Sequence, residues 1–128
     1  MIKAGIIGSG NIGTDLLLKL IKTDDIDPVI FAGRRSSSNG ISIAKKKGIN
    51  TTDKGINFFI ENTNFCDIIY DCTNALDAKY HAEIFKTQGV KVIDLTPAKV
   101  GDLCVPVINS EIIKTKSNVN LITCGGQA

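Results

Sequence analysis

The chain begins Met1-Ile2-Lys3-Ala4-Gly5-Ile6-Ile7-Gly8-Ser9-Gly10-Asn11-Ile12-Gly13, and this stretch decides the fold. An apolar, strand-like run leads into the pattern Gly-x-Gly-x-x-Gly, and an amphipathic helical pattern comes directly after it. In such a unit Gly8 permits a tight turn, Gly10 lets a pyrophosphate approach the backbone, and Gly13 lets the helix pack closely on the sheet. The N–H groups at the helix start then face the phosphates. The stretch predicts a dinucleotide-binding turn, and the alternative is a turn without a ligand.

Strand-like and helix-like patterns alternate along the rest of the chain, which predicts an α/β fold. The helix after the glycine turn has an apolar face made of Ile12, Leu16, Leu17, Leu20 and Ile21. Further strands are expected at residues 28–33, 50–52, 67–71, 90–95, 105–108 and 119–123, helices at 41–47, 54–61 and 75–88, and a helical turn at 110–114. Because such alternation implies right-handed crossovers, we expect a doubly wound, mainly parallel sheet, a Rossmann-like NAD(P)-binding domain.

The loop after the second expected strand indicates which dinucleotide binds. An NAD site usually offers an Asp or Glu there, about 20 residues past the glycine turn, to hold the ribose hydroxyls. This chain has Arg34, Arg35 and Ser36 instead, with no acid nearby in the sequence. Guanidinium groups suit a 2′-phosphate, so we favour NADP over NAD. A solvated basic loop, or an arginine stacked on adenine without discrimination, are the alternatives.

Polar residues come after two later strands, at the sheet edge where ligands bind in this kind of fold. Thr73, Asn74 and Thr96 can hydrogen-bond the ribose or the nicotinamide, although the same residue types also cap loops. His81 lies beside Tyr80 within an expected helix, and we expect it to be exposed or half-buried with a structural role.

Composition and length limit the class of protein. The 128 residues suit one domain, 1–128, and are too few for a cofactor domain plus a substrate domain. A formal charge of +2 gives no argument for nucleic acid or an anionic membrane, and no apolar run approaches a membrane span. We expect a cytoplasmic protein. No metal site is expected, because the spacings of His81 and the four cysteines do not suit zinc. Cys66, Cys72 and Cys104 are expected to be reduced and buried.

Cys124 differs from the other cysteines because two glycines come directly after it. Gly125 and Gly126 allow a sharp turn from the last expected strand into a helix. A thiol at a helix N-terminus has its thiolate favoured by the helix dipole and by free N–H groups. The same N–H groups can hold a developing oxyanion, so Cys124 is a candidate nucleophile, with a buried structural thiol as the alternative.

Several segments together make the chain resemble the acylating acetaldehyde dehydrogenases of aromatic meta-cleavage pathways. The resemblance is carried by residues 8–16, 92–98, 105–109 and 118–128, the last of which reads Asn-Val-Asn-Leu-Ile-Thr-Cys-Gly-Gly-Gln-Ala. It implies oxidation of a short aldehyde by NAD(P)+ with coenzyme A. Cys124 would attack the carbonyl to form a hemithioacetal, hydride loss would leave a thioester, and coenzyme A would cleave it. The family's cofactor contacts fall on Ser9, Gly10, Asn11 and Ile12.

The resemblance also implies partners and a missing part. It implies a homo-oligomer in full-length form, working beside 4-hydroxy-2-oxovalerate aldolase. It further implies that the chain is the cofactor-binding domain, that a substrate and dimerisation domain is absent, and that the chain is inactive alone. The sequence Gly33-Arg34-Arg35-Ser36 departs from the family's Gly-Ile-Asp-Pro type, which puts NAD preference in doubt. A non-catalytic NAD(P)-binding or redox-sensing module, or a related semialdehyde dehydrogenase, are the alternatives.

Overall fold

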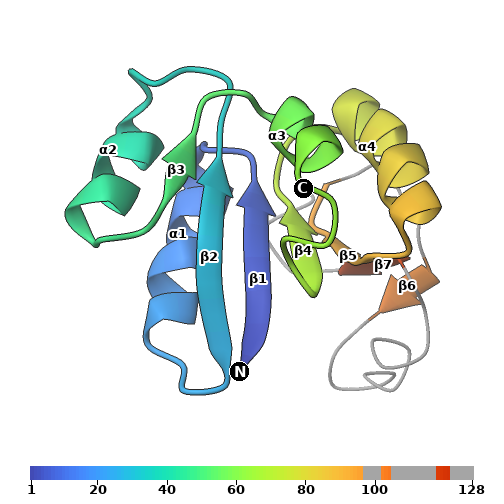
Figure 1. The fold of residues 1–128 in the computed structure, drawn as a ribbon, viewed down its shortest axis with the longest axis horizontal. Coiled ribbons are helices and arrows are strands. Elements are labelled where there is room, and N and C mark those ends of the chain that lie inside the picture. The colour runs from blue at the N-terminus through green and yellow to red at the C-terminus, as the bar shows by residue number, and fades with distance from the viewer. Residues whose placement is uncertain (97–101, 105–117, 122–128) are drawn as a thin grey trace.

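The computed structural model describes residues 1–96, 102–104 and 118–121 (Figure 1). Strands and helices alternate through most of this part of the chain. In order they are β1 (Ile2–Ile7), α1 (Asn11–Ile21), β2 (Ile26–Ala32), α2 (Asn39–Lys46), β3 (Thr51–Thr52), α3 (Ile56–Glu61), β4 (Ile68–Asp71), α4 (Ala75–Gln88), β5 (Lys91–Asp94), β6 (Asp102–Cys104) and β7 (Asn118–Leu121).

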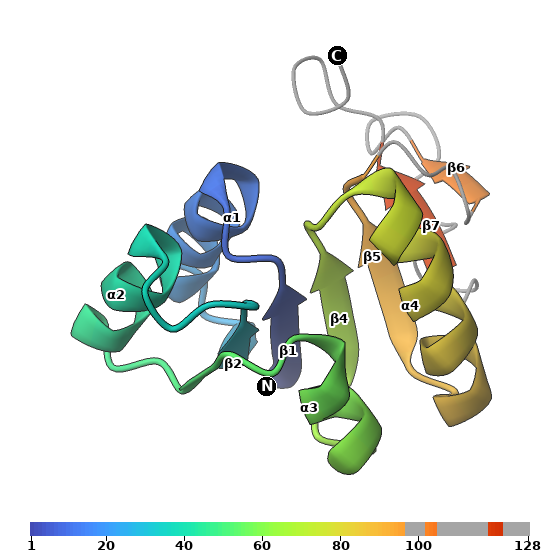
Figure 2. The same ribbon diagram turned by 90° about the horizontal axis from the view of Figure 1, so that it is seen from above.

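The described strands form one parallel sheet in the order β3-β2-β1-β4-β5-β7-β6. The chain winds outward in one direction from β1 to β3, and then returns to start β4 on the other side of β1 (Figure 2). This reversal between β1 and β4 is the topological switch point, where ligands of such sheets bind beyond the carboxyl ends of the strands. The expected doubly wound α/β fold is confirmed.

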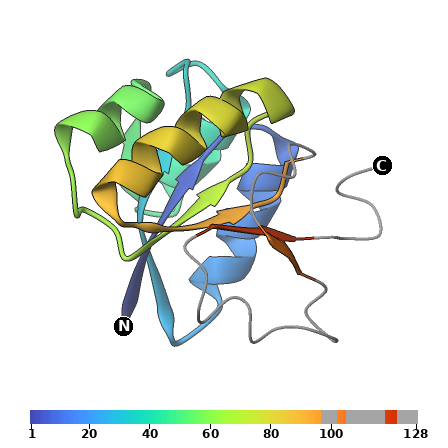
Figure 3. The same ribbon diagram turned by 90° about the vertical axis from the view of Figure 1, so that its right-hand side faces the viewer.

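Two hydrophobic layers hold the helices on the sheet. On one face, Leu17 of α1 and Ile41 of α2 pack with Ile6 of β1, while Phe59 of α3 and Phe85 of α4 pack on the other face. Figure 3 shows α3 and α4 together on one side of the sheet and α1 on the opposite side. Alternate residues of a strand face opposite sides of the sheet, and the central strands contribute buried apolar residues to both hydrophobic layers. They are therefore apolar on both faces, as buried parallel strands require.

Most expected elements agree with the structure to within a few residues, and α4 has the expected bounds. The second strand begins at Ile26, earlier than Pro28, because Ile26 already pairs with Ile2 of β1. The register shifts just after Pro28, and a strand tolerates a residue without an N–H at such an irregularity. Ile12 and Ile21 are 44% and 37% exposed, so the apolar face of α1 is narrower than expected. A short strand lies at Asp102–Cys104, and the strand expected at 105–108 and the turn expected at 110–114 lie outside the described residues.

Candidate functional site

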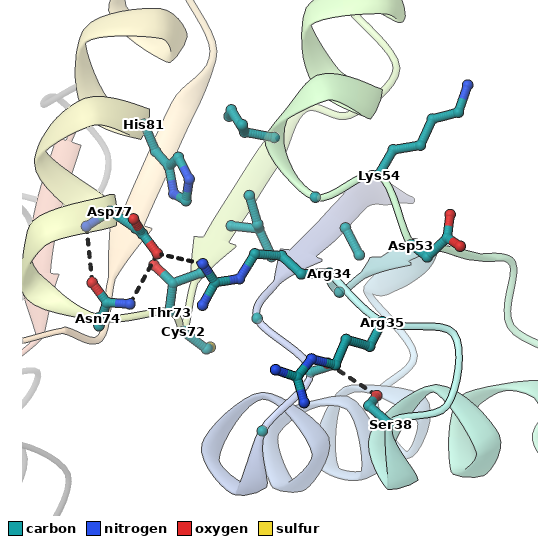
Figure 4. A pocket seen from close by; sticks show the side chains of 18 of the residues that line it. Arg34, Arg35, Ser38, Asp53, Lys54, Cys72, Thr73, Asn74, Asp77 and His81 are labelled. Atoms are coloured by element: carbon teal, nitrogen blue, oxygen red, sulfur yellow. Dashed lines mark hydrogen bonds and ion pairs between the residues drawn. The ribbon is translucent and has the colours of Figure 1, made fainter.

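A cavity of about 880 Å³ opens at the switch point, at the carboxyl ends of β1, β2 and β4. Its lining residues come from four separate segments of the chain: 7–10, 32–38, 53–57 and 72–81. Figure 4 shows these segments around the cavity, with Arg34 extended across it toward α4. The glycine turn and the loops after β2 and β4, which the sequence singles out separately, therefore meet at one place.

The glycine turn forms the first wall of the cavity. Gly8 has φ +114°, a conformation that favours glycine, and its N–H donates to the carbonyl of Ala32 over 2.8 Å. A Cβ on Gly13 would lie 2.0 Å from the carbonyl oxygen of Gly8, so α1 reaches this close approach only with glycine there. A Cβ on Gly10 would meet nothing within 4 Å. The space beside Gly10 is therefore open to a ligand at the start of α1.

The loop after β2 carries two arginines with different surroundings. Arg34 Nη1 lies 3.4 Å from Asp77 Oδ2, in the first turn of α4. Arg35 also lines the cavity, and among the described residues it makes no ion pair. No acid lies near these arginines in the sequence, but the parallel fold brings Asp77 and Asp53, from later segments, to the same cavity.

Ser38 connects this loop to the glycine turn. Its hydroxyl accepts from the N–H of Ile41, which caps α2, and donates to Ser9 Oγ over 3.1 Å. The N-terminal ends of α1 and α2 therefore converge on the side of the cavity that carries the arginines. Helix N-termini and guanidinium groups both favour anions, so this side suits the phosphates of a dinucleotide.

The turn after β4 is held by a buried carboxylate. Asp71, 1% exposed, accepts through Oδ1 from the Thr73 N–H at 3.1 Å and the Thr73 hydroxyl at 2.5 Å. The neighbouring strand repeats this arrangement, since Asp94 Oδ1 accepts from the N–H and the hydroxyl of Thr96. Asp71 and Asp94 are register partners in β4 and β5. The loops after β4 and β5 thus each contain an Asp-x-Thr turn of the same kind.

His81 is buried, at 6% exposed, so the expectation that it is exposed or half-buried is wrong. Its Nδ1 lies 2.9 Å from Asp71 Oδ2, and its side chain also lines the cavity. Figure 4 shows the ring pointing from α4 into the cavity. The reason is that α4 turns this position toward β4, where the Asp71 carboxylate offers a polar partner.

The described thiols are poorly suited to nucleophilic chemistry. Burial, with nearby Asp67, raises the pKa of Cys66 to about 12, against a smaller opposing effect of Lys3. Burial, with nearby Asp71 and Asp94, raises the pKa of Cys72. Both are free and buried, as expected, and neither forms a thiolate readily. The side chain of Cys104 and the whole of Cys124, the candidate nucleophile, lie outside the described residues.

The structure brings most of the predicted cofactor residues together and leaves a few apart. Those that line the cavity are Gly8, Ser9, Gly10, Arg34, Arg35, Thr73 and Asn74. Asn11, Ile12 and Ser36 are exposed and not part of the lining, Gly13 packs under the turn, and Thr96 is 2% exposed beside Asp94.

Sequence reasoning missed the lining residues that come from α3 and α4. They include Asn57 of α3 and Asp77, Tyr80 and His81 of α4, and Asp53 in the loop before α3 was missed as well. Only Asp77 has a local signal, because Asn74 caps α4 by accepting from the Asp77 N–H three residues on. In the described part of the chain no group of three or more His, Cys, Asp or Glu side chains can hold a metal ion. In those same residues, no helix has the length and apolar character to cross a membrane.

Comparison with known proteins gives a family and a set of longer relatives. The family model described as semialdehyde dehydrogenase, NAD binding domain, matches residues 3–116. The acetaldehyde dehydrogenase of Bacillus cereus is 46% identical over 127 residues, 99% of this chain and 42% of that protein. The acetaldehyde dehydrogenase of Spirochaeta aurantia is 42% identical over 127 residues, covering 99% of this chain and 43% of that protein. The chain thus spans less than half the length of these relatives.

Solved structures support the fold. Aspartate semialdehyde dehydrogenase from Candida albicans, a structure with NADP, superposes with a TM-score of 0.71 over 96% of this chain and 42% of that one. At 19% identity, this likeness concerns the arrangement of strands and helices alone.

Proposed function

This chain belongs to the family of semialdehyde dehydrogenase NAD-binding domains, and from that premise we propose that it is the cofactor-binding part of an acylating acetaldehyde dehydrogenase. The single observation that carries the proposal is the cavity at the switch point, where the glycine turn, Arg35 and Thr73 meet. Its size and its open space beside Gly10 suit the phosphates and ribose of a dinucleotide.

The proposed reaction converts an aldehyde, coenzyme A and NAD(P)+ into acyl-CoA and NAD(P)H. Cys124 acts as the nucleophile: its thiolate adds to the aldehyde carbonyl and forms a hemithioacetal. The bound dinucleotide supplies the hydride acceptor, and loss of hydride and the hydroxyl proton leaves a thioester on Cys124. The thiol of coenzyme A then displaces Cys124 and carries the acyl group away. The resemblance of residues 118–128 to this family supports that role.

We propose NADP as the favoured dinucleotide, with NAD bound more weakly. The Asp77 carboxylate engages Arg34, which leaves Arg35 as the cavity guanidinium without an ion pair among the described residues. Ser38 and the N-terminus of α2 lie on the same side. A 2′-phosphate there would receive charge-assisted hydrogen bonds, each worth about 1.5–3 kcal/mol.

Titration of the purified chain with NADPH and NADH, monitored by nicotinamide fluorescence, tests this proposal. We expect both to bind, NADPH more tightly, and Arg35→Ala to weaken NADPH binding by at least about tenfold while changing NADH binding little. Ser36→Ala is the matched control, because Ser36 is exposed and not in the cavity lining. Failure of both dinucleotides to bind the folded chain would contradict the proposed function.

The complete reaction tests the remaining parts of the proposal. We expect no coenzyme A-dependent acetaldehyde oxidation by this chain alone, because it spans less than half the length of its relatives and we propose that the rest of such an enzyme positions the aldehyde. In the longer enzyme, Cys124→Ala should abolish the reaction and leave cofactor binding intact.

The raised pKa values of Cys66 and Cys72 argue against a redox-sensing module based on those thiols. A semialdehyde dehydrogenase would reduce NADP+ with a semialdehyde and not with acetaldehyde plus coenzyme A.

The proposal extends to the setting of the enzyme through the family resemblance alone. We propose a cytoplasmic homo-oligomer that receives a short aldehyde from 4-hydroxy-2-oxovalerate aldolase. Co-purification of the longer enzyme with that aldolase, and its mass by light scattering, test these two points.

A further inference from the structure

A buried pair of side chains at the cavity has no role in the function proposed so far. His81 Nδ1 and Asp71 Oδ2 are 2.9 Å apart, and the two side chains are 7% and 2% exposed. His81 is the only histidine in the chain. It lies on the second turn of α4 and not in the loop after β4, yet it also lines the cavity. A polar pair this deeply buried restricts its ring to one orientation.

Asp71 determines which nitrogen of His81 carries the proton. Asp71 Oδ1 already accepts two hydrogen bonds from Thr73, and Oδ2 faces His81. An ionised carboxylate only accepts hydrogen bonds, so Nδ1 is the protonated nitrogen. In a neutral imidazole the other nitrogen, Nε2, is then an acceptor. His81 therefore offers a hydrogen-bond acceptor to a ligand in the cavity.

The positions of the glycine turn and of the loop after β2 indicate that the base of a dinucleotide would lie on the side of the cavity that carries His81. Pyrophosphate belongs at the glycine turn, and the adenosine ribose belongs at the end of β2, beside Arg34 and Arg35. The base is attached to that ribose, and Asn57 at the start of α3 and His81 on α4 are among the residues that line the same cavity. Figure 4 shows His81 on this side, with its ring directed toward Arg34 and Thr73.

We propose that His81 is a specificity-determining residue whose Nε2 accepts a hydrogen bond from the exocyclic amino group of the adenine base. This inference rests on the proposed function, because it assigns one residue to the base of the dinucleotide. A 6-amino purine donates at this position, whereas a 6-oxo purine such as hypoxanthine presents an acceptor. Two acceptors would then face each other without a proton, and a buried unpaired polar group weakens binding.

The test compares NADPH with its hypoxanthine analogue, in which oxygen replaces the amino group. Dissociation constants are measured by nicotinamide fluorescence at one fixed pH. We expect the unchanged chain to bind NADPH roughly tenfold more tightly than the analogue, the loss of one hydrogen bond. Equal affinity for the two would overturn this inference and leave the proposed function standing, whereas absence of NADPH binding would overturn both.

Two variants separate base recognition from a structural role. His81→Asn keeps an amide N–H that can donate to Asp71, but the shorter side chain has no acceptor at the position of Nε2, so the preference for adenine should disappear while NADPH still binds. In Asp71→Asn the side-chain oxygen can still accept from Thr73 while the amide donates to His81 Nδ1. The proton then moves to Nε2, and the preference should reverse toward the hypoxanthine analogue. A preference unchanged in a folded His81→Asn chain would overturn the inference.

Nitrogen-15 NMR of the unchanged chain tests the proton assignment without any variant. Because the chain has one histidine, both ring-nitrogen resonances belong to His81, and only Nδ1 and Nε2 have to be told apart, by their couplings to the ring carbon protons. We expect the pattern of a neutral ring protonated on Nδ1, and a shift of the Nε2 resonance on addition of NADPH that the hypoxanthine analogue does not reproduce. A ring protonated on Nε2 in the free chain, or an Nε2 resonance insensitive to NADPH, would contradict the proposal.

Discussion

The two walls of the cavity are built in different ways. On the first wall backbone packs against backbone, since a Cβ on Gly13 would lie 2.0 Å from the Gly8 carbonyl oxygen and one on Gly40 2.2 Å from that of Ser9. On the second wall buried polar side chains hold the loop, with Asp71 accepting from Thr73 and facing His81. The first wall is therefore sensitive to added volume, and the second to the loss of a single hydrogen bond.

The largest expected effects come from two glycines of the first wall, one of which is needed for packing and the other for access of a ligand. Gly13→Ala should destabilise the chain by about 3 kcal/mol, because the added methyl group forces α1 away from the Gly8 backbone. Gly10→Ala should change stability by within about 1 kcal/mol, because its Cβ meets nothing, yet weaken NADPH binding at least about tenfold. Urea unfolding and fluorescence titration measure the two effects. Equal stabilities of the two variants would remove the contrast on which the comparison depends.

A smaller effect is expected from the second wall. Thr73→Val keeps the shape of the side chain but removes the hydroxyl that donates to Asp71, and should cost about 1–2 kcal/mol in the free energy of unfolding. Thr73→Ser keeps the hydroxyl and is the matched control. If valine and serine have the same effect in urea unfolding, the hydrogen bond does not stabilise this wall.

Alkaline pH should weaken the buried interior that supports both walls. Cys66 has an ordinary pKa of 9.0, raised in the fold to about 12, and the pKa of Cys72 is also raised. Below pH 9.0 the thiols are neutral in both the folded and the unfolded chain, so burying them does not lower the free energy of unfolding. As the pH rises from 9.0 toward about 12, the thiols of the unfolded chain lose their protons first, which favours unfolding. We expect a loss of about 1 kcal/mol per thiol by about pH 10, allowing for solvent screening. Cys66→Ala should have a shallower decline; an equally steep one would assign the loss elsewhere.

The smallest effect concerns the ion pair that joins the two walls. Arg34 is 77% exposed, so Asp77→Asn should change stability by less than about 1 kcal/mol. A double-mutant cycle with Arg34→Ala and Asp77→Ala, read by urea unfolding, measures the pair directly. A coupling well above 1 kcal/mol would mean that the walls are joined more firmly than an exposed pair allows.

The features predicted correctly from sequence are those with a local cause. The glycine turn results from three glycines at fixed spacing, and α4 runs from Ala75 to Gln88 because Asn74 caps its start and Gly89, with φ +70°, ends it. The missed residues of the site have no such cause. His81 comes after a surface-like neighbour, Tyr80, and nothing in the sequence connects it with a carboxylate ten residues earlier.

The sequence by itself determined the fold class, the glycine turn after β1 and the two arginines of the neighbouring loop, because spacing and residue type suffice for each. Only the tertiary structure decided that Arg34 meets Asp77 while Arg35 makes no ion pair among the described residues, and that Asp71 contacts both Thr73 and His81. The physical reason is that parallel strands end at one edge of the sheet. Side chains from distant segments therefore become neighbours there, and each one's partner depends on how helices and strands pack.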